Sequence, residues 1–300
     1  MTHTSKPLRE LTLEVEVAIL AQDALGEGPH WDEASGTLLR VDIDGGRVLA
    51  WSPASGEQRT IELDYKPSFV IPRAAGGYAI GAPAAVDLLD AAGQSEQRIE
   101  LDIDGVEHRT NDAKADAAGR LWVGTYSPTH RVGGDALWRI EPDGRSERAV
   151  TGISIGNGLG WSPDGATMYF IDSETKRIDA WSFELESGTL SERRPFAEVP
   201  EKCGILDGMT VDDDGGVWLA LIFGGAVHRY TPDGELDLIV RMPVSTPSSV
   251  AFGGERLHEL FVTSSRRFVP AGERAAQPLA GSVLSVQPGV TGPPADAFTG

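Results

Sequence analysis

The chain has 300 residues, with 45 acidic against 26 basic side chains, a formal net charge of −19 and a single cysteine, Cys203. A surface this acidic repels nucleic-acid phosphates and anionic membranes, so neither is expected as a partner. A chain of this length buries most of its apolar surface without disulfides, and one cysteine forms no internal disulfide, which favours a cytoplasmic protein.

The first element expected along the chain is a strand around Leu13–Leu20. Its sequence TLEVEVAIL alternates acidic with apolar residues, which is the two-residue period of a half-buried strand. It lacks the uninterrupted apolar core of a signal peptide, and we expect no membrane span anywhere in the sequence. Residues 1–11 are expected to form an N-terminal tail before this strand.

Beyond this strand the sequence repeats one unit six times. In each copy a polar residue, here called the opener, begins a short apolar strand that ends in a glycine-bearing turn. Successive openers are 41, 43, 46, 50 and 41 residues apart, which is the period of four-stranded propeller blades. The openers are Glu27, Ser68, Asn111, Asn157, Asp207 and Ser248 or Ser249.

Each repeat holds several short apolar runs separated by tight-turn sequences such as DGG and PDG, with no long helical period. This pattern predicts an all-β fold, a six-bladed β-propeller of four-stranded antiparallel blades, with residues 1–300 as one domain. The strand around Leu13–Leu20 has no opener, so we expect it to close the ring by pairing with the last blade near Gly281–Gln287. Residues 290–300 are rich in Pro and Gly and are expected to form an irregular tail.

Four openers share one register, five residues before the first turn position, so a ring of blades gathers them at one place. Three of them, Glu27, Asn157 and Asp207, offer two carboxylates and an amide oxygen, which are hard donors suited to Ca²⁺, Mg²⁺ or Mn²⁺. No histidine shares the register, which lowers the expectation of zinc. Three protein ligands leave positions open for water and substrate. In the alternative interpretation, polar residues followed by Gly satisfy backbone N–H groups at strand starts.

Further candidates lie near these openers. Arg109 is two residues before Asn111, on the same face of an extended chain, where it contacts a substrate oxygen or pairs with surplus carboxylates. His130 and Arg131 occupy the loop of the third blade and are candidates for a specificity loop, although a lone loop histidine is more often plain surface. Cys203, four residues before Asp207, either lines the site or is a partly buried inert thiol.

Four motifs resemble the gluconolactonase/regucalcin family, also called senescence-marker-protein-like. They are GEGPHWD, RTNDAKADAAGRLWVGT, IGNGLGWSPDG and ILDGMTVDDDGGVWLA, and the similarity runs from about Gly26 to the end of the chain. The resemblance implies a six-bladed propeller with one divalent cation on Glu27, Asn157 and Asp207. It also implies substrate contacts from Arg109 and Asn111. One departure is the short third-blade loop SPTHRVGG, where animal members carry a substrate-holding glutamate.

The residues and the resemblance together predict a metal-dependent carboxylic-ester hydrolase that opens a sugar lactone. The cofactor expected first is one Ca²⁺, with Mg²⁺, Mn²⁺ or Zn²⁺ as alternatives. Asp207 is the predicted general base for the attacking water. Two other interpretations stay open: a phosphotriester or xenobiotic-lactone hydrolase on the same site, and a calcium-binding propeller without turnover.

Overall fold

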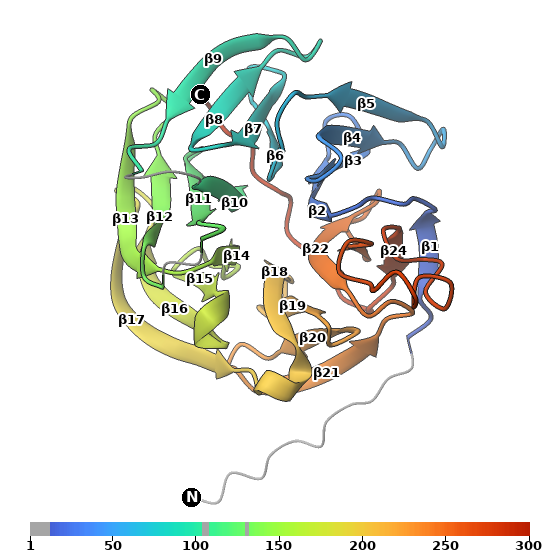
Figure 1. Cartoon of the computed structure of the whole chain (residues 1–300). Helices are drawn as coiled ribbons and strands as arrows, with labels where there is room; N and C mark the ends of the chain where they lie inside the picture. The colour runs from blue at the N-terminus through green and yellow to red at the C-terminus, as the bar shows by residue number, and fades with distance from the viewer. Residues whose placement is uncertain (1–12, 104–107, 130–131) are drawn as a thin grey trace, which may run out of the picture.

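A computed structural model describes residues 13–103, 108–129 and 132–300. Six four-stranded antiparallel sheets follow one another around a central axis, which confirms the predicted six-bladed β-propeller (Figure 1). In five of the six sheets the strands follow chain order from the axis outward. We call the face at which the first strand of each blade begins the upper face, and the face at which it ends the lower face.

The strands have the following bounds in chain order. Those before the third blade are β1 (Glu16–Ile19), β2 (Gly26–Asp32), β3 (Thr37–Asp42), β4 (Arg47–Trp51), β5 (Gln58–Glu62), β6 (Val70–Pro72), β7 (Tyr78–Ala82), β8 (Ala85–Leu89) and β9 (Ser95–Glu100). The third and fourth blades contain β10 (Arg109–Ala115), β11 (Leu121–Tyr126), β12 (Asp135–Ile140), β13 (Ser146–Ile153), β14 (Gly156–Trp161), β15 (Thr167–Asp172), β16 (Arg177–Glu184) and β17 (Thr189–Glu198). The last two contain β18 (Ile205–Val211), β19 (Val217–Ile222), β20 (Ala226–Tyr230), β21 (Leu236–Arg241), β22 (Pro247–Gly253), β23 (Glu259–Ser264) and β24 (Val283–Val286). Two short 3₁₀ turns, η1 (Ser173–Thr175) and η2 (Glu201–Cys203), complete the described elements.

The two ends of the chain meet in the last blade, whose strand order is β1-β24-β23-β22. Strand β1 pairs antiparallel with β24, with Glu16 opposite Ser285 and Val17 opposite Leu284. The expected closure of the ring by the N-terminal strand is therefore confirmed. The tail expected at residues 1–11 lies outside the described residues.

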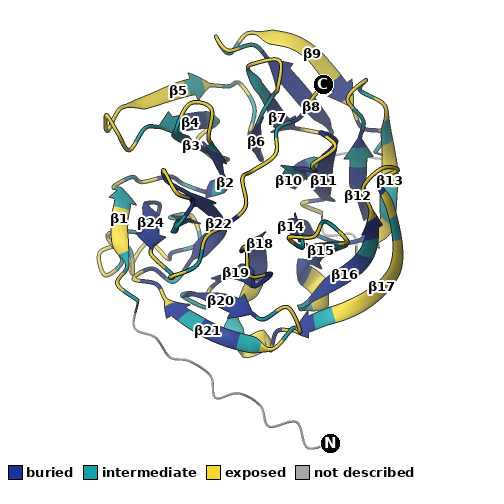
Figure 2. Ribbon diagram, turned by 180° about the vertical axis from the view of Figure 1, so that it is seen from behind, coloured by how far each residue is buried: buried dark blue, intermediate teal, exposed yellow. Residues whose placement is uncertain are grey.

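The core lies between blades rather than within one. Figure 2 shows the strands near the axis buried, whereas the outermost strands β5, β9, β13 and β17 are largely exposed. Trp122 and Trp218 are fully buried at equivalent positions of two blades. Each donates its indole N–H at 2.8 Å to a buried aspartate six residues earlier, Asp116 and Asp212 respectively. Repeated aromatic positions therefore serve packing between blades.

The C-terminal segment, residues 290–300, crosses the lower face from the last blade to the second and third (Figure 1). Its backbone is tied at both ends: Gly292 N–H donates to Leu257 at 2.9 Å, and Phe298 N–H donates to Pro72 at 2.9 Å. The Phe298 side chain is fully buried in the apolar cluster between blades two and three. The segment is irregular in backbone, held at Gly292 and Phe298 and exposed between them.

Candidate functional site

The upper ends of the first strands carry the openers. Glu27 lies in β2, Asn111 in β10, Asn157 in β14 and Asp207 in β18, and all four strands surround the axis in Figure 1. Each of these strands breaks its pairing register at the opener, between Glu27 and His30 in β2 and between Leu206 and Met209 in β18, for example. Such bulges turn side chains away from regular alternation, which directs the openers toward the axis.

The glycine after an opener allows neighbouring first strands to approach closely. A Cβ on Gly158 would lie 2.7 Å from the carbonyl oxygen of Asp207 and 2.6 Å from the backbone nitrogen of Met209. A Cβ on Gly208 would lie 1.9 Å from Ser249 Oγ. No side chain fits at either position, so the Asn-Gly and Asp-Gly pairs bring β14, β18 and β22 into backbone contact.

Glu27 and Asp207 form a pair of like charges, of which Asp207 is buried and Glu27 half-buried. Burial is the first cause that raises the pKa of Glu27 well above its ordinary value, followed by the carboxylates of Asp207 and Asp112. Burial likewise raises the pKa of Asp207, opposed by hydrogen bonds from Asn157 and Glu27 and by the charge of Arg109. Each carboxyl group lies close enough to act on the pKa of the other, so without a cation the pair favours a state in which one of the two is protonated.

The two asparagines are held by their amide N–H groups. Asn157 donates Nδ2–H to Ser173 Oγ at 3.2 Å, and Asn111 donates Nδ2–H to the carbonyl oxygen of Gly156 at 2.9 Å. Because an amide presents its oxygen opposite its nitrogen, these bonds leave each Oδ1 as an acceptor that a ligand can use. Asn157 itself is buried, with 7% of its surface exposed.

Arg109 lies at the start of β10, with its guanidinium carbon 5.2 Å from the centre of the Tyr126 ring. Its Nη1 is buried and has no hydrogen-bond partner among the described residues. Burial lowers its pKa, while the charges of Glu27 and Asp207 oppose that shift. Those carboxylates are therefore near enough to act on the pKa of Arg109. Its Nη1 nevertheless stays available to another acceptor.

Asp112 is a residue of the site that the sequence analysis missed. Burial raises its pKa to about 6, and its charge acts on both Glu27 and Asp207. Regular alternation places Asp112 on the opposite face of the strand from Asn111, but the bulge between Thr110 and Ala113 brings both toward the axis. The same break recurs at the other three openers and is seen only in the structure, so the sequence carries no signal for Asp112.

The remaining openers connect neighbouring blades. Ser68 Oγ is 2.7 Å from Thr110 Oγ1, and Ser248 Oγ donates to the carbonyl oxygen of Gly26 at 2.6 Å. Cys203 is partly buried at the end of η2 and packs against an apolar cluster. His130 and Arg131, the predicted specificity loop, lie outside the described residues.

The donor set fits a hard divalent cation. Two carboxylates that repel each other and a fixed amide oxygen are the oxygen donors that Ca²⁺ prefers, and a cation would displace the proton that their repulsion favours. Over the described ranges, no group of three or more His, Cys, Asp and Glu side chains forms a metal-binding cluster. The candidate site differs from such a cluster because one of its three donors is an amide.

Comparison with known proteins identifies the family. The model of the SMP-30/Gluconolactonase/LRE-like region matches residues 25–266. The chain belongs to this family. Regucalcin of Danio rerio is 33% identical over 293 residues, covering 96% of this chain and 99% of that protein. Human regucalcin is 31% identical over 283 residues, covering 92% of this chain and 94% of that protein.

Solved structures of the family share the architecture. A calcium-binding regucalcin from Agrobacterium tumefaciens superimposes with a TM-score of 0.92 at 27% identity, covering 97% of this chain and 99% of that one. A luciferin-regenerating enzyme superimposes with a TM-score of 0.87 at 28% identity, covering 96% and 99%. The part of the chain that the structure describes has no helix long and apolar enough to cross a membrane.

Proposed function

We propose that this protein is a metal-dependent lactonase that opens a sugar lactone. It holds one divalent cation, for which Ca²⁺ is the first candidate, on Glu27, Asn157 and Asp207. The observation that carries the proposal is the mutually repelling pair of carboxylates beside the fixed amide of Asn157 and the buried Nη1 of Arg109, which has no partner among the described residues. Membership of a family whose description includes gluconolactonase supports the reaction class, and the calcium-binding relative supports the cation. The single cysteine supports a cytoplasmic location.

When bound, the cation supplies a Lewis acid that polarises the lactone carbonyl and stabilises negative charge on its oxygen. The residues of the chain bind the substrate and accept the proton that the attacking water gives up. Asp207 accepts a proton from the attacking water at a carboxylate oxygen. Arg109 donates from Nη1 to a substrate oxygen, and the Oδ1 of Asn111 accepts from a ring hydroxyl.

The experiment measures hydrolysis of glucono-1,5-lactone above the spontaneous rate, before and after EDTA and after Ca²⁺, Mg²⁺, Mn²⁺ or Zn²⁺ is added back. Asp207→Ala is compared with Asp214→Asn, which removes one charge from the exposed turn after the same strand. We expect EDTA and Asp207→Ala to abolish activity and the control to keep it. Activity that survives EDTA or Asp207→Ala rules out the mechanism.

A specific observation favours a second substrate class on the same site, a lactone or phosphotriester with an apolar group. Ile205 and Phe223 are 47% and 55% exposed, and Phe223 stacks edge-on with Phe268 at 5.7 Å. Ile205 pairs with Ile222, so these side chains lie at the same end of the fifth blade as Asp207. Comparing kcat/KM for gluconolactone, an alkyl-substituted lactone and paraoxon separates these classes.

The remaining interpretation is a calcium-binding protein without turnover. The similarity to a calcium-binding regucalcin supports calcium binding and says nothing about turnover. Calorimetry with Ca²⁺ tests binding separately from turnover. Tight Ca²⁺ binding that is lost in Asp207→Ala, together with no hydrolysis across the lactone and phosphotriester panel, would replace the lactonase proposal with this one.

A further inference from the structure

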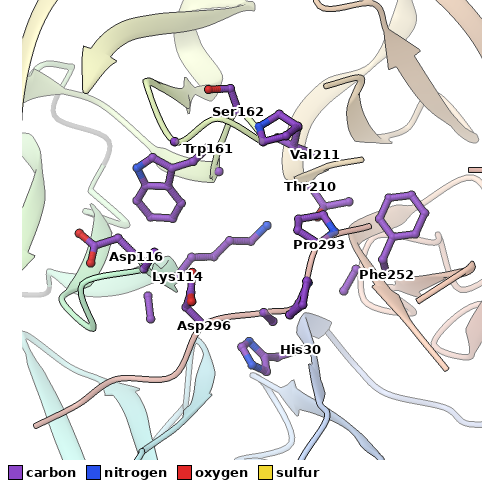
Figure 3. A pocket seen from close by; sticks show the side chains of 18 of the residues that line it. His30, Lys114, Asp116, Trp161, Ser162, Thr210, Val211, Phe252, Pro293 and Asp296 are labelled. Atoms are coloured by element: carbon purple, nitrogen blue, oxygen red, sulfur yellow. The ribbon is translucent and has the colours of Figure 1, made fainter. Parts of the chain in front are cut away.

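A second cavity, of about 230 Å³, lies at the lower ends of the first strands, opposite the ends that carry Glu27 and Asp207. Figure 3 shows its lining side chains. Between the two ends, residues including Gly28, Asp112 and Ser249 surround a space of about 10 Å³, which has room for about one water molecule.

The repeat that gathers the openers also builds this cavity. The residues three positions after five openers all line it, and so do the residues four positions after them. They are His30, Lys114, Gly160, Thr210 and Ala251, followed by Trp31, Ala115, Trp161, Val211 and Phe252. Five blades thus contribute equivalent positions, which makes the lower cavity a second ring of converging side chains.

The C-terminal segment forms the remaining wall. Pro293, Pro294, Ala295 and Asp296 line the cavity, and the hydrogen bonds of Gly292 and Phe298 hold the segment on either side. Figure 3 shows Pro293 facing the side chain of Lys114. The exposed residues Ala117 and Asp296 lie at the rim, so the cavity opens toward solvent on the lower face.

Lys114 is the cation inside this largely apolar lining. It reaches between Trp161 and Pro293 in Figure 3, and its Nζ donates to the carbonyl oxygen of Met209 at 2.7 Å. An ammonium group has three N–H donors, and the other two N–H groups of Lys114 donate to no acceptor among the described residues. His30 stands beside it as a neutral imidazole, since burial and the charge of Lys114 lower its pKa to about 4.

The charge of Asp112, two residues earlier in β10, acts on Lys114, but no hydrogen bond joins their side chains among the described residues. The acidic residues that line the cavity leave the Lys114 donors free as well. Asp116 accepts from Arg120 Nε and from Trp122 Nε1, both at 2.8 Å, so its carboxylate is already neutralised. Asp296 is exposed at the rim. The interior therefore presents aromatic walls, the Thr210 hydroxyl and one ammonium group with spare donors, and it favours an anion with an apolar body.

We propose that the lower cavity binds a small organic monocarboxylate with a flat or branched apolar body, of the size of benzoate. Its carboxylate accepts hydrogen bonds from Lys114 Nζ, and its apolar body lies between Trp161 and Phe252. The size fits, because a cavity of about 150 Å³ with apolar walls already holds benzene. Neither the lactone nor the cation takes part, so this binding stands apart from the proposed function.

The test is isothermal titration calorimetry of the full chain with benzoate and with benzyl alcohol, which has nearly the same shape and no charge. We expect saturable one-to-one binding of benzoate, at least about tenfold tighter than benzyl alcohol. Lys114→Met removes the ammonium group and keeps the length of the side chain, so it should remove that tenfold preference. Lys66→Met is the matched control, because Lys66 is exposed and paired with Asp44.

Two calorimetric results would overturn the proposal: equal affinity for benzoate and benzyl alcohol, or unchanged benzoate binding in Lys114→Met. The comparison of the two ligands on the unaltered protein holds even where Lys114→Met fails to fold. A crystal soaked with 4-iodobenzoate gives an independent readout, since the anomalous signal of iodine must lie between Trp161 and Phe252. Iodine found only elsewhere also overturns it.

Discussion

Asn157 is fixed by Ser173. The asparagine donates Nδ2–H to Ser173 Oγ at 3.2 Å, and the serine hydroxyl donates to the carbonyl oxygen of Leu206 at 2.7 Å. Leu206 precedes Asp207, so one buried hydroxyl links the strand of one proposed ligand to the strand of another. A cation site gains rigidity from such hydrogen bonds behind its ligands.

Ser173→Ala should weaken cation binding while leaving the fold intact. Without the hydroxyl the Asn157 amide loses the acceptor that sets its orientation, so we expect Ca²⁺ affinity to fall by about tenfold. Calorimetric titration with Ca²⁺ measures the change, with the exposed Ser187→Ala as control. Activity at saturating Ca²⁺ should recover most of its value. An unchanged affinity would show that Asn157 needs no such support.

The metal-free protein should become less stable relative to Asp207→Asn as the pH rises from about 4 to 7. The folded state raises the pKa of Asp207 to about 7, whereas an exposed aspartate titrates near about 4. In this window the folded state binds more protons than the unfolded state, so the free energy of unfolding falls as pH increases. Urea unfolding in EDTA at pH 5 and pH 8 should show a change of at least about 1 kcal/mol between the two proteins.

Calcium should reverse this trend, because it binds the deprotonated carboxylates and displaces the proton from Asp207. The rise in Tm produced by Ca²⁺ is expected to increase from pH 5 to pH 8 in the unaltered protein and to be absent in Asp207→Asn. Differential scanning calorimetry with and without Ca²⁺ measures both. A calcium-induced shift of equal size in Asp207→Asn would place the cation elsewhere.

The spacing of the openers was enough to predict the ring, because a period of 41 to 50 residues has few other structural meanings. It was also enough to place Glu27, Asn157 and Asp207 at one end of the first strands. Asp112 was not predicted as a site residue, because a one-residue bulge cannot be read from the alternation of apolar and polar residues along a strand. The lower cavity was not predicted either. Its wall depends on the docking of the C-terminal segment, and Phe298, which docks it, is far in sequence from the residues it packs against.

Gly158→Ala should destabilise the protein and not merely the site. The new Cβ would approach the carbonyl oxygen of Asp207 within 2.7 Å, and backbone atoms cannot move aside as a flexible side chain would. We expect a loss of about 1–3 kcal/mol in the free energy of unfolding. Urea unfolding measures it. Gly36→Ala is a contrast at a turn with open space, where only the positive φ of 63° opposes a side chain.

Arg109 should act on the substrate rather than on the cation. Its buried Nη1 has no partner among the described residues, and its stacking on Tyr126 at 5.2 Å holds the guanidinium in place. Arg109→Met keeps much of the apolar stem and removes the donors, so we expect kcat/KM for gluconolactone to fall by about tenfold to a hundredfold. Arg109→Lys should restore little, because an ammonium group lacks the planar fork. Ca²⁺ affinity, measured by calorimetry, should not decrease in either variant. Arg109→Met removes a positive charge near Glu27 and Asp207, which favours a cation, and Arg109→Lys keeps that charge. A loss of Ca²⁺ binding with unchanged kcat/KM at saturating Ca²⁺ would assign Arg109 to the support of the carboxylates instead.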